Sequence, residues 1–166
     1  MDIYQATFQQ WLILINWWIA VAFLLIIFVY DLKFYLVADV VVLPAAALAF
    51  IFNLFSGFNF FTLMLACAVG AGFFLLQFVV SKGRWIGSGD IRIGLLMGAL
   101  LGWPHVLLAL VLAYTIGSIV SIFLILGKKK QWTDRVPFGT FLSVATFISL
   151  LYGQEIIRWY LQLFLL

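Results

Sequence analysis

Long apolar stretches separated by short polar interruptions dominate this chain. A membrane-spanning helix needs about 20 mostly apolar residues, and charged or turn-forming residues mark where such helices end. Six segments are predicted to be helical: Trp11–Tyr30, Val40–Phe55, Phe60–Val80, Ile91–Leu101, His105–Leu126 and Pro137–Tyr152. The stretch Gln154–Leu166 is expected to lie at the membrane interface or to pack against the bundle. The pattern therefore predicts an all-α polytopic membrane protein with about six transmembrane helices.

The composition supports this interpretation. Hydrophobic residues make up 67% of the chain, and the mean hydropathy is +1.23. These values exclude a soluble globular domain, and 166 residues leave no room for one beside the helices. We expect residues 1–166 to form a single integral-membrane domain. The acidic start of the chain does not resemble a secretory signal peptide, so the first segment is expected to be a permanent span.

The fourth segment, Ile91–Leu101, is about half as long as a normal span. Gly94, Gly98 and Gly102 recur at every fourth position along it. Small residues at this spacing let helix backbones approach closely in a membrane. Packing alone explains such a row, although it would also bring the start of this helix near the helix that leads to Asp31.

The basic residues predict the orientation in the membrane. Eight of the nine lie in alternate interruptions of the apolar pattern: Lys33, Lys82, Arg84, Arg92, Lys128, Lys129, Lys130 and Arg135. By the positive-inside rule these interruptions are cytoplasmic and the N-terminus is outside. Asp31 and Asp90 then lie at the same cytoplasmic face of the inner or plasma membrane. The net charge of +3 is thus explained by topology and does not indicate a nucleic-acid partner.

Asp31 and Asp90 are the candidate chemical groups, because ionisable residues at a membrane edge are costly and often mark functional sites. Asp31 is expected to follow a helix C-terminus, where the helix dipole disfavours a negative charge. Asp90 follows Gly87 and Gly89, which would let an extended substrate lie against the backbone. Considered singly, each acid also fits a solvated turn, and Asp31 fits an ion pair with Lys33.

Other reactive groups are scarce. Asp39 and Asp134 each precede a predicted helix, where a carboxylate suits the helix N-terminus. The chain has one cysteine, Cys67, and one histidine, His105. A single cysteine cannot form an intrachain disulfide or a four-cysteine zinc site, and a single histidine cannot form a histidine cluster. We expect no metal and no cofactor.

A pair of neighbouring carboxyl groups can hydrolyse a peptide bond. Close carboxylates do not both ionise easily, so they share a proton. The ionised group can take a proton from water while the neutral group polarises the scissile carbonyl. Asp31 and Asp90 are therefore interpreted as a membrane-embedded aspartyl protease pair.

Three short motifs follow one another along nearly the whole chain: Asp31 with Asp39 eight residues later, Gly87-Ser88-Gly89-Asp90-Ile91-Arg92, and Val136-Pro137-Phe138-Gly139. Their type and order resemble the type IV prepilin peptidases, which belong to the Gly-x-Gly-Asp aspartyl proteases of membranes. Arg92 takes the basic position of the second motif. Ala38 departs from the pattern, because the family usually has proline there.

The resemblance implies that Asp31 and Asp90 are the catalytic residues. By the same resemblance the active-site loops are supported by the residues Gly87, Gly89, Arg92, Pro137 and Gly139. Asp39 and Lys33 are further, secondary candidates. The implied reaction is removal of a short basic leader from a prepilin or pseudopilin at the cytoplasmic face. Membrane lipid is the other expected partner, and the oligomeric state stays open.

Many bacterial members of that family carry an extra cytoplasmic domain with paired Cys-x-x-Cys motifs and also methylate the new N-terminus. This chain has a single cysteine. It therefore resembles a short, peptidase-only form or a fragment of a longer enzyme, and no methyltransferase activity is expected.

Two alternatives stay open at this point. One is an intramembrane protease of the presenilin or signal-peptide-peptidase type, although the Pro-Ala-Leu motif of those enzymes is absent from the C-terminal region. The other is a non-catalytic membrane scaffold or small transporter subunit, in which the acids are merely solvated. Transporters usually show internal repeats, and none is evident here.

Overall fold

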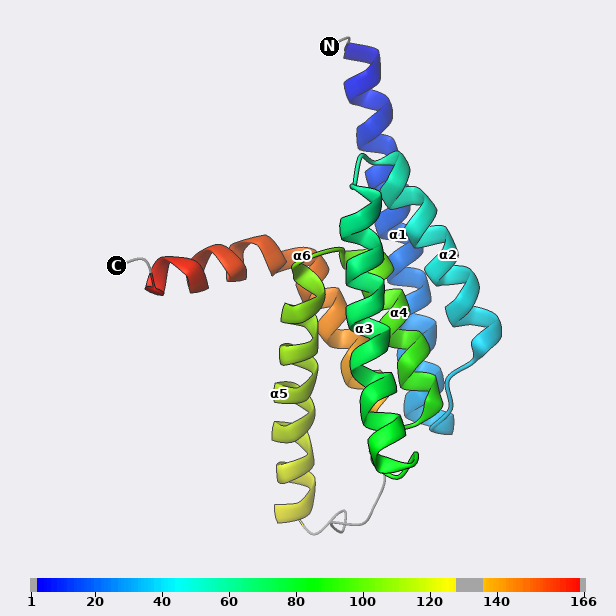
Figure 1. Cartoon of the computed structure of the whole chain (residues 1–166), viewed down its shortest axis with the longest axis vertical. Coiled ribbons are helices and arrows are strands. Elements are labelled where there is room, and N and C mark those ends of the chain that lie inside the picture. The colour runs from blue at the N-terminus through cyan, green and yellow to red at the C-terminus, as the bar shows by residue number, and fades with distance from the viewer. Residues whose placement is uncertain (1–2, 128–135, 165–166) are drawn as a thin grey trace.

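The computed structural model describes residues 3–127 and 136–164, and every regular element within them is an α-helix (Figure 1). The six helices are α1 (Ile3–Phe34), α2 (Asp39–Phe55), α3 (Phe60–Ser81), α4 (Ser88–Leu101), α5 (His105–Leu126) and α6 (Phe138–Phe164). The all-α class is therefore confirmed, and α5 has the predicted bounds. Asp134 and the lysines at positions 128–130 lie outside the described residues.

Four segments are long and apolar enough to cross a membrane: Leu14–Phe34, Phe60–Ser81, His105–Leu126 and Phe138–Leu163. The remaining helices are shorter, with 17 residues in α2 and 14 in α4. At about 1.5 Å per residue α4 rises about 21 Å, which is less than the ~30 Å of bilayer hydrocarbon. The fold is thus that of a polytopic membrane protein in which α4 is too short to span.

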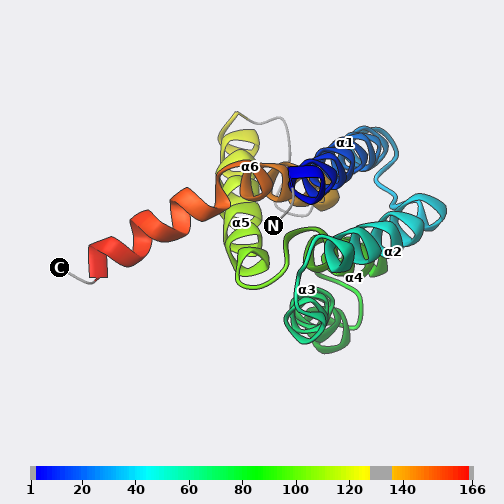
Figure 2. The same cartoon turned by 90° about the horizontal axis from the view of Figure 1, so that it is seen from above.

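The short helix α4 lies inside the bundle. It packs most extensively against α3 and α2 and also contacts α6 and α5, while α1 packs against α2 and α6. Figure 2, seen from above, shows α1, α2 and α3 around α4, with α5 on the side away from α2. Most residues of α4 are buried, including Asp90 in its first turn. The other helices therefore shield α4 from lipid.

The glycine row of α4 packs against α3. A Cβ atom at Gly94 would overlap the carbonyl oxygen of Gly70, and a Cβ atom at Gly98 would overlap that of Ala66. Only a hydrogen fits at these positions, so the two backbones approach closely, as predicted. The glycine row itself meets α3 and not α1, but Asp90 at the start of α4 does lie near Asp31, as expected. The spacing of small residues identifies a packing face but not the helix that covers it.

Both helices that carry the candidate acids are longer than predicted. Helix α1 continues through Asp31 to Phe34 and ends at Tyr35, which has a positive φ of 55°. The amide of Tyr35 donates a 2.8 Å hydrogen bond to the carbonyl of Asp31. Helix α4 begins at Ser88, so it includes Asp90. The expectation that Asp31 follows the helix end is therefore wrong, because a charged residue ends the apolar segment without ending the helical hydrogen bonding.

Helix α6 begins at Phe138, directly after Pro137, and runs to Phe164, well beyond the predicted end at Tyr152. Figures 1 and 2 show its C-terminal part turning away from the other helices. The stretch from Gln154 to Phe164 therefore continues the helix and does not pack against the bundle.

A buried asparagine holds the end of α4 that is remote from Asp90. The amide of Asn53 in α2 donates to the carbonyl oxygens of Ala99 and Leu100, at 2.6 and 3.0 Å, and its own oxygen accepts a 2.9 Å hydrogen bond from Asn16 in α1. The last carbonyls of a helix have no partner within it, and in apolar surroundings they must find one elsewhere. Asn53 meets that need and so fixes α4 against α1 and α2.

Candidate active site

Asp31 is 5% exposed and meets the first turn of α6. Its Oδ2 accepts a 2.7 Å hydrogen bond from the main-chain amide of Thr140 and a 3.2 Å hydrogen bond from the Thr140 hydroxyl. A Cβ atom at Gly139 would lie 2.9 Å from the same oxygen, so the glycine permits this approach. A helix N-terminus favours negative charge. The first turn of α6 thus offers the Asp31 carboxylate two donors and a favourable dipole.

Asp90 is 7% exposed and lies in the first turn of its own helix. Its Oδ2 accepts a 3.0 Å hydrogen bond from the main-chain amide of Gly87. Burial raises the pKa of Asp90 from its ordinary 3.8 to about 6, and the charge of Asp31 raises this pKa further, against the lowering effect of the Gly87 hydrogen bond. The two acids are therefore close enough to interact, and burial makes Asp90 retain a proton more readily than an ordinary aspartate.

Both acids line one cavity of about 820 Å³ at the same end of the bundle. Its wall comes from the ends of α1 and α3, the starts of α2, α4 and α6, Tyr114 of α5 and the connecting residues 35–37, 83–87 and 136–137. The prediction that Asp31 and Asp90 lie at the same level therefore agrees with the fold. The cavity is large enough to admit a stretch of polypeptide as well as water.

The two loops next to the acids are interlocked. A Cβ atom at Gly89 would lie only 2.5 Å from Cγ2 of Val37, which belongs to the loop after Asp31. At Gly87 the nearest atom outside the neighbouring residues, Oδ2 of Asp90, would be 3.7 Å away, which is an ordinary contact. The expectation that Gly89 leaves room for substrate is therefore wrong, since Val37 already fills that space.

Asp39 and Arg92 form an ion pair at the rim of the cavity. Arg92 Nη1 lies 2.6 Å from Asp39 Oδ1, and the two side chains are 46% and 37% exposed for Asp39 and Arg92, respectively. Asp39 is the first residue of α2 and Arg92 lies in α4, so the pair links the helix that follows Asp31 to the helix that carries Asp90. Arg92 therefore has a partner in the protein other than either buried acid.

The remaining predicted residues lie at different distances from the cavity. Pro137 and Gly87 line it, and Gly139 touches Asp31 from the buried start of α6. Lys33 does not line it: its Nζ lies 5.5 Å from the centre of the Phe34 ring. In the part of the chain that the structure describes, Asp31 forms no ion pair with Lys33.

Comparison of the sequence with known proteins identifies the family to which the chain belongs. The profile of the type IV leader peptidase family matches residues 18–122, a range that includes both acids of the cavity. The chain belongs to the type IV leader peptidase family. It is 34% identical over 154 residues to a prepilin leader peptidase/N-methyltransferase of Aeromonas hydrophila, with 89% of this chain and 51% of the relative covered. It is 32% identical over 138 residues to the protein of that name from Pseudomonas aeruginosa, with 80% and 47% covered.

The chain spans about half the length of these curated relatives. No solved structure matches it. Membership of the leader peptidase family agrees with the resemblance to prepilin peptidases rather than with the presenilin-type alternative. The matched range stops at residue 122 and does not include α6. The start of α6 is linked to the site by the hydrogen bond from Thr140 to Asp31.

Three residues in the cavity wall or in contact with Asp31 were not predicted from the sequence. Thr140 binds Asp31, while Gln77 and Tyr114 line the cavity and join by a 2.8 Å hydrogen bond between the Tyr114 hydroxyl and Gln77 Oε1. A glutamine within an apolar span was a usable signal for Gln77, because polar groups in a membrane usually have a function or a partner. The partners of Thr140 and Tyr114 lie far away in the sequence and left no local signal.

The arrangement offers acid and base chemistry from two carboxyl groups. Both carboxyl groups are buried, which favours their neutral forms, and Asp31 has in addition two donors from Thr140 that favour its ionised form. Within residues 3–127 and 136–164, no three His, Cys, Asp or Glu side chains gather closely enough to hold a metal ion. The groups that line the cavity can therefore accept a proton at one aspartate and donate one at the other.

Proposed function

We propose that this member of the leader peptidase family is an aspartic endopeptidase that removes the leader from a prepilin or pseudopilin, with Asp31 and Asp90 as its catalytic pair. The observation that carries the proposal is the shared cavity, in which two buried carboxyl groups from different helices interact. The printed names of the relatives supply the substrate class, since they are called prepilin leader peptidases.

The different hydrogen-bond partners of the two acids support different roles. Asp31 takes a proton from water, because two donors of Thr140 favour the carboxylate before the reaction. The neutral Asp90 donates a hydrogen bond to the scissile carbonyl. The water oxygen bonds to the carbonyl carbon, and the C–N bond then breaks as the proton held by Asp31 passes to the leaving nitrogen. The products are a free carboxylate on the leader and a free amine on the mature protein.

Neighbouring residues hold this pair in place. Gly139 lets α6 approach Asp31, Gly89 accommodates Val37, and the Asp39–Arg92 ion pair joins the starts of α2 and α4. Because Asp39 is ion-paired with Arg92, its role is to position α2 and α4 and not to take a direct part in the chemistry. Gly87 contributes its amide to Asp90.

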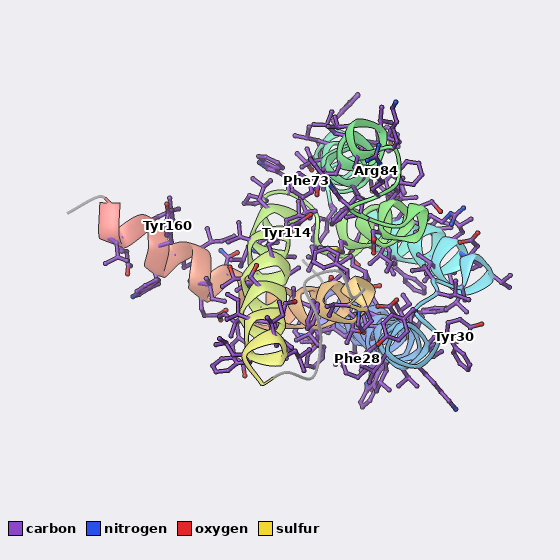
Figure 3. The ribbon with its side chains drawn as sticks, turned by 90° about the horizontal axis from the view of Figure 1, so that it is seen from below. Phe28, Tyr30, Phe73, Arg84, Tyr114 and Tyr160 are labelled. Atoms are coloured by element: carbon purple, nitrogen blue, oxygen red, sulfur yellow. The ribbon has the colours of Figure 1, made fainter. Side chains whose placement is uncertain are left out.

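We further propose that the cavity opens at the cytoplasmic face of the inner membrane. Lys82 and Arg84 follow α3 at the cavity end of the bundle, and Arg84 lines the cavity itself. Basic residues collect on the cytoplasmic side of membrane proteins. Figure 3, seen from below, shows Arg84 at this end of α3. The positive charges of Lys82 and Arg84 would also attract anionic lipid headgroups at this end of the bundle.

The test is cleavage of a prepilin. The chain is co-expressed with a tagged prepilin from the same genome, and leader removal is followed by a gel shift for wild type, Asp31→Asn and Asp90→Asn. Asparagine keeps the size of the side chain and removes its titratable proton. Cleavage by wild type and by neither variant is expected. Cleavage that persists in either variant, at comparable protein levels, contradicts the assigned pair.

A further inference from the structure

Two polar residues from apolar helices, Gln77 and Tyr114, lie together in the wall of the cavity. Gln77 belongs to the apolar helix α3 and Tyr114 to the apolar helix α5, and both line the cavity with the two acids. Polar side chains are costly in membrane helices unless they have partners or face water. A packing role alone would be met by apolar residues, so the position of this pair at the cavity needs another explanation.

The ring of Tyr114 is held in one orientation. Its centroid lies 5.7 Å from that of Phe73 and 5.0 Å from that of Phe138, both in edge-on arrangements. Figure 3 shows Phe73 and Tyr114 facing each other from α3 and α5. The hydroxyl of Tyr114 donates a 2.8 Å hydrogen bond to Gln77 Oε1. These contacts fix the polar ends of both side chains before any substrate binds.

The pair keeps hydrogen-bonding capacity for a third group. The Tyr114 hydroxyl has used its donor and retains its acceptor lone pairs, while the Gln77 amide nitrogen has two donors. One of these reaches the carbonyl of Phe73 at a long 3.4 Å, and no further partner of Gln77 occurs in the described residues. The pair thus presents one donor and one acceptor side by side. A peptide unit presents the complementary acceptor and donor.

We propose that Gln77 and Tyr114 form a subsite that binds the main chain of the substrate next to the scissile bond. The inference rests on the proposed peptidase function and extends it to how the polypeptide is held. The Gln77 amide donates to a substrate carbonyl, and the Tyr114 hydroxyl accepts from a substrate amide. Two other polar side chains of the wall already have partners: Asp39 with Arg92, and Asp31 with Thr140. Recognition of the main chain at this point requires no particular side chain in the substrate.

The first test is the kinetics of prepilin cleavage in detergent or vesicles. Tyr114→Phe keeps the ring contacts and removes the acceptor, while Gln77→Leu keeps the approximate size and removes the amide oxygen and nitrogen. Loss of one hydrogen bond predicts a rise of KM by about 3- to 10-fold for each variant. The double variant is expected to lose less than the product of the two, because each residue positions the other.

Matched controls separate binding from packing. Thr115→Val removes a hydroxyl from the next residue of α5, whose side chain is exposed and bonds only its own helix at Val111. Gln154→Leu removes an exposed amide of α6 outside the cavity. Both controls are expected to keep the wild-type KM. A lower thermal midpoint with an unchanged KM in Tyr114→Phe and Gln77→Leu would overturn the subsite and leave a packing role.

A second test does not depend on cleavage. In the Asp90→Asn background, the photoreactive residue p-benzoylphenylalanine replaces Tyr114 and, as a control, Thr115. The subsite predicts a crosslink to the tagged prepilin from position 114 and none from position 115. A crosslink without cleavage by the wild type would refute the peptidase proposal and retain peptide binding. No crosslink from position 114 refutes the subsite, whatever the cleavage result.

Discussion

The main-chain amide of Thr140 lies 2.7 Å from Oδ2 of Asp31, and this hydrogen bond joins residues that are 109 positions apart in the sequence. It places the positive end of the α6 dipole at the last turn of α1. The position of the Asp31 carboxylate therefore depends on a helix that begins long after both acids in the chain. A substitution at the start of α6 should therefore change the position of the Asp31 carboxylate while Asp31 itself is retained.

Gly139→Ala tests this dependence. The added Cβ atom would lie 2.9 Å from Asp31 Oδ2 and 2.8 Å from Cδ1 of Ile93, so α6 must move away. We expect prepilin cleavage to fall at least about 10-fold and the free energy of unfolding to fall by about 1–3 kcal/mol, as for overpacking. Gly72→Ala in α3 is the control, because a Cβ atom there meets nothing within 4 Å. Equal activity of the two variants would show that this contact does not matter.

Gly89→Ala is expected to disrupt the loops beside both acids. Its methyl group would lie 2.5 Å from Cγ2 of Val37, so one loop must shift. The expected result is a cleavage rate at least about 10-fold lower, by the mechanism of overpacking. Val37→Ala in the same chain removes the colliding atoms and should restore part of the activity. If the double variant is no better than Gly89→Ala, the collision is not the cause.

The pKa of Asp90, raised to about 6 by burial and by the charge of Asp31, predicts the pH dependence of cleavage. The neutral form of Asp90 is the proposed hydrogen-bond donor, so the rate should fall as the pH rises above about 6. The measurement is kcat against pH with a purified prepilin. A rate that stays constant from pH 5 to about pH 8 would contradict the assigned role of Asp90.

The same raised pKa predicts a change in stability. The folded state holds the Asp90 proton more tightly than the unfolded state, so this stabilisation is complete below the ordinary pKa of 3.8 and is lost as the pH rises through about 6. The thermal midpoint of the wild type should therefore decrease between these pH values relative to that of Asp90→Asn. Parallel curves for the two proteins would argue against a buried, proton-retaining Asp90.

Asp39→Asn should have a small effect. The Asp39–Arg92 pair is partly exposed, and exposed ion pairs contribute about 0–1 kcal/mol. We expect cleavage to fall by less than about 10-fold, in contrast to the complete loss expected for Asp31→Asn. A more stringent test of the ion pair is the double variant Asp39→Arg with Arg92→Asp, in which the two charges are exchanged. This double variant should recover activity that either single substitution loses. Complete inactivity of Asp39→Asn in a folded protein would make Asp39 part of the chemistry.

The sequence predicted the positions of the helices well, but it predicted poorly which helices pack against each other. Apolar length and flanking turn residues predicted His105–Leu126 with its observed bounds. The ends near the acids were less accurate, because α1 extends one turn past its apolar segment to include Asp31. The glycines of α4 predicted close packing, although nothing in their spacing could indicate α3 as the partner.

The site was predictable only where residues form local motifs. Asp31 and Asp90 were recognisable by their charge at the membrane edge and by the motif around Asp90. Thr140 and Tyr114 were not, because their roles arise from contacts between helices distant in sequence. Gly89 was recognised as a special position, but its reason, the packing of Val37, required the three-dimensional arrangement.

Three consecutive residues at the start of α6 contact either Tyr114 or Asp31. Phe138 contacts the ring of Tyr114, Gly139 touches Ile93 and Asp31, and Thr140 bonds Asp31. A shift of this one turn would change the proton acceptor and the proposed peptide-binding pair at the same moment. Substitutions there should therefore impair affinity and turnover together, so that no variant of this turn separates the two.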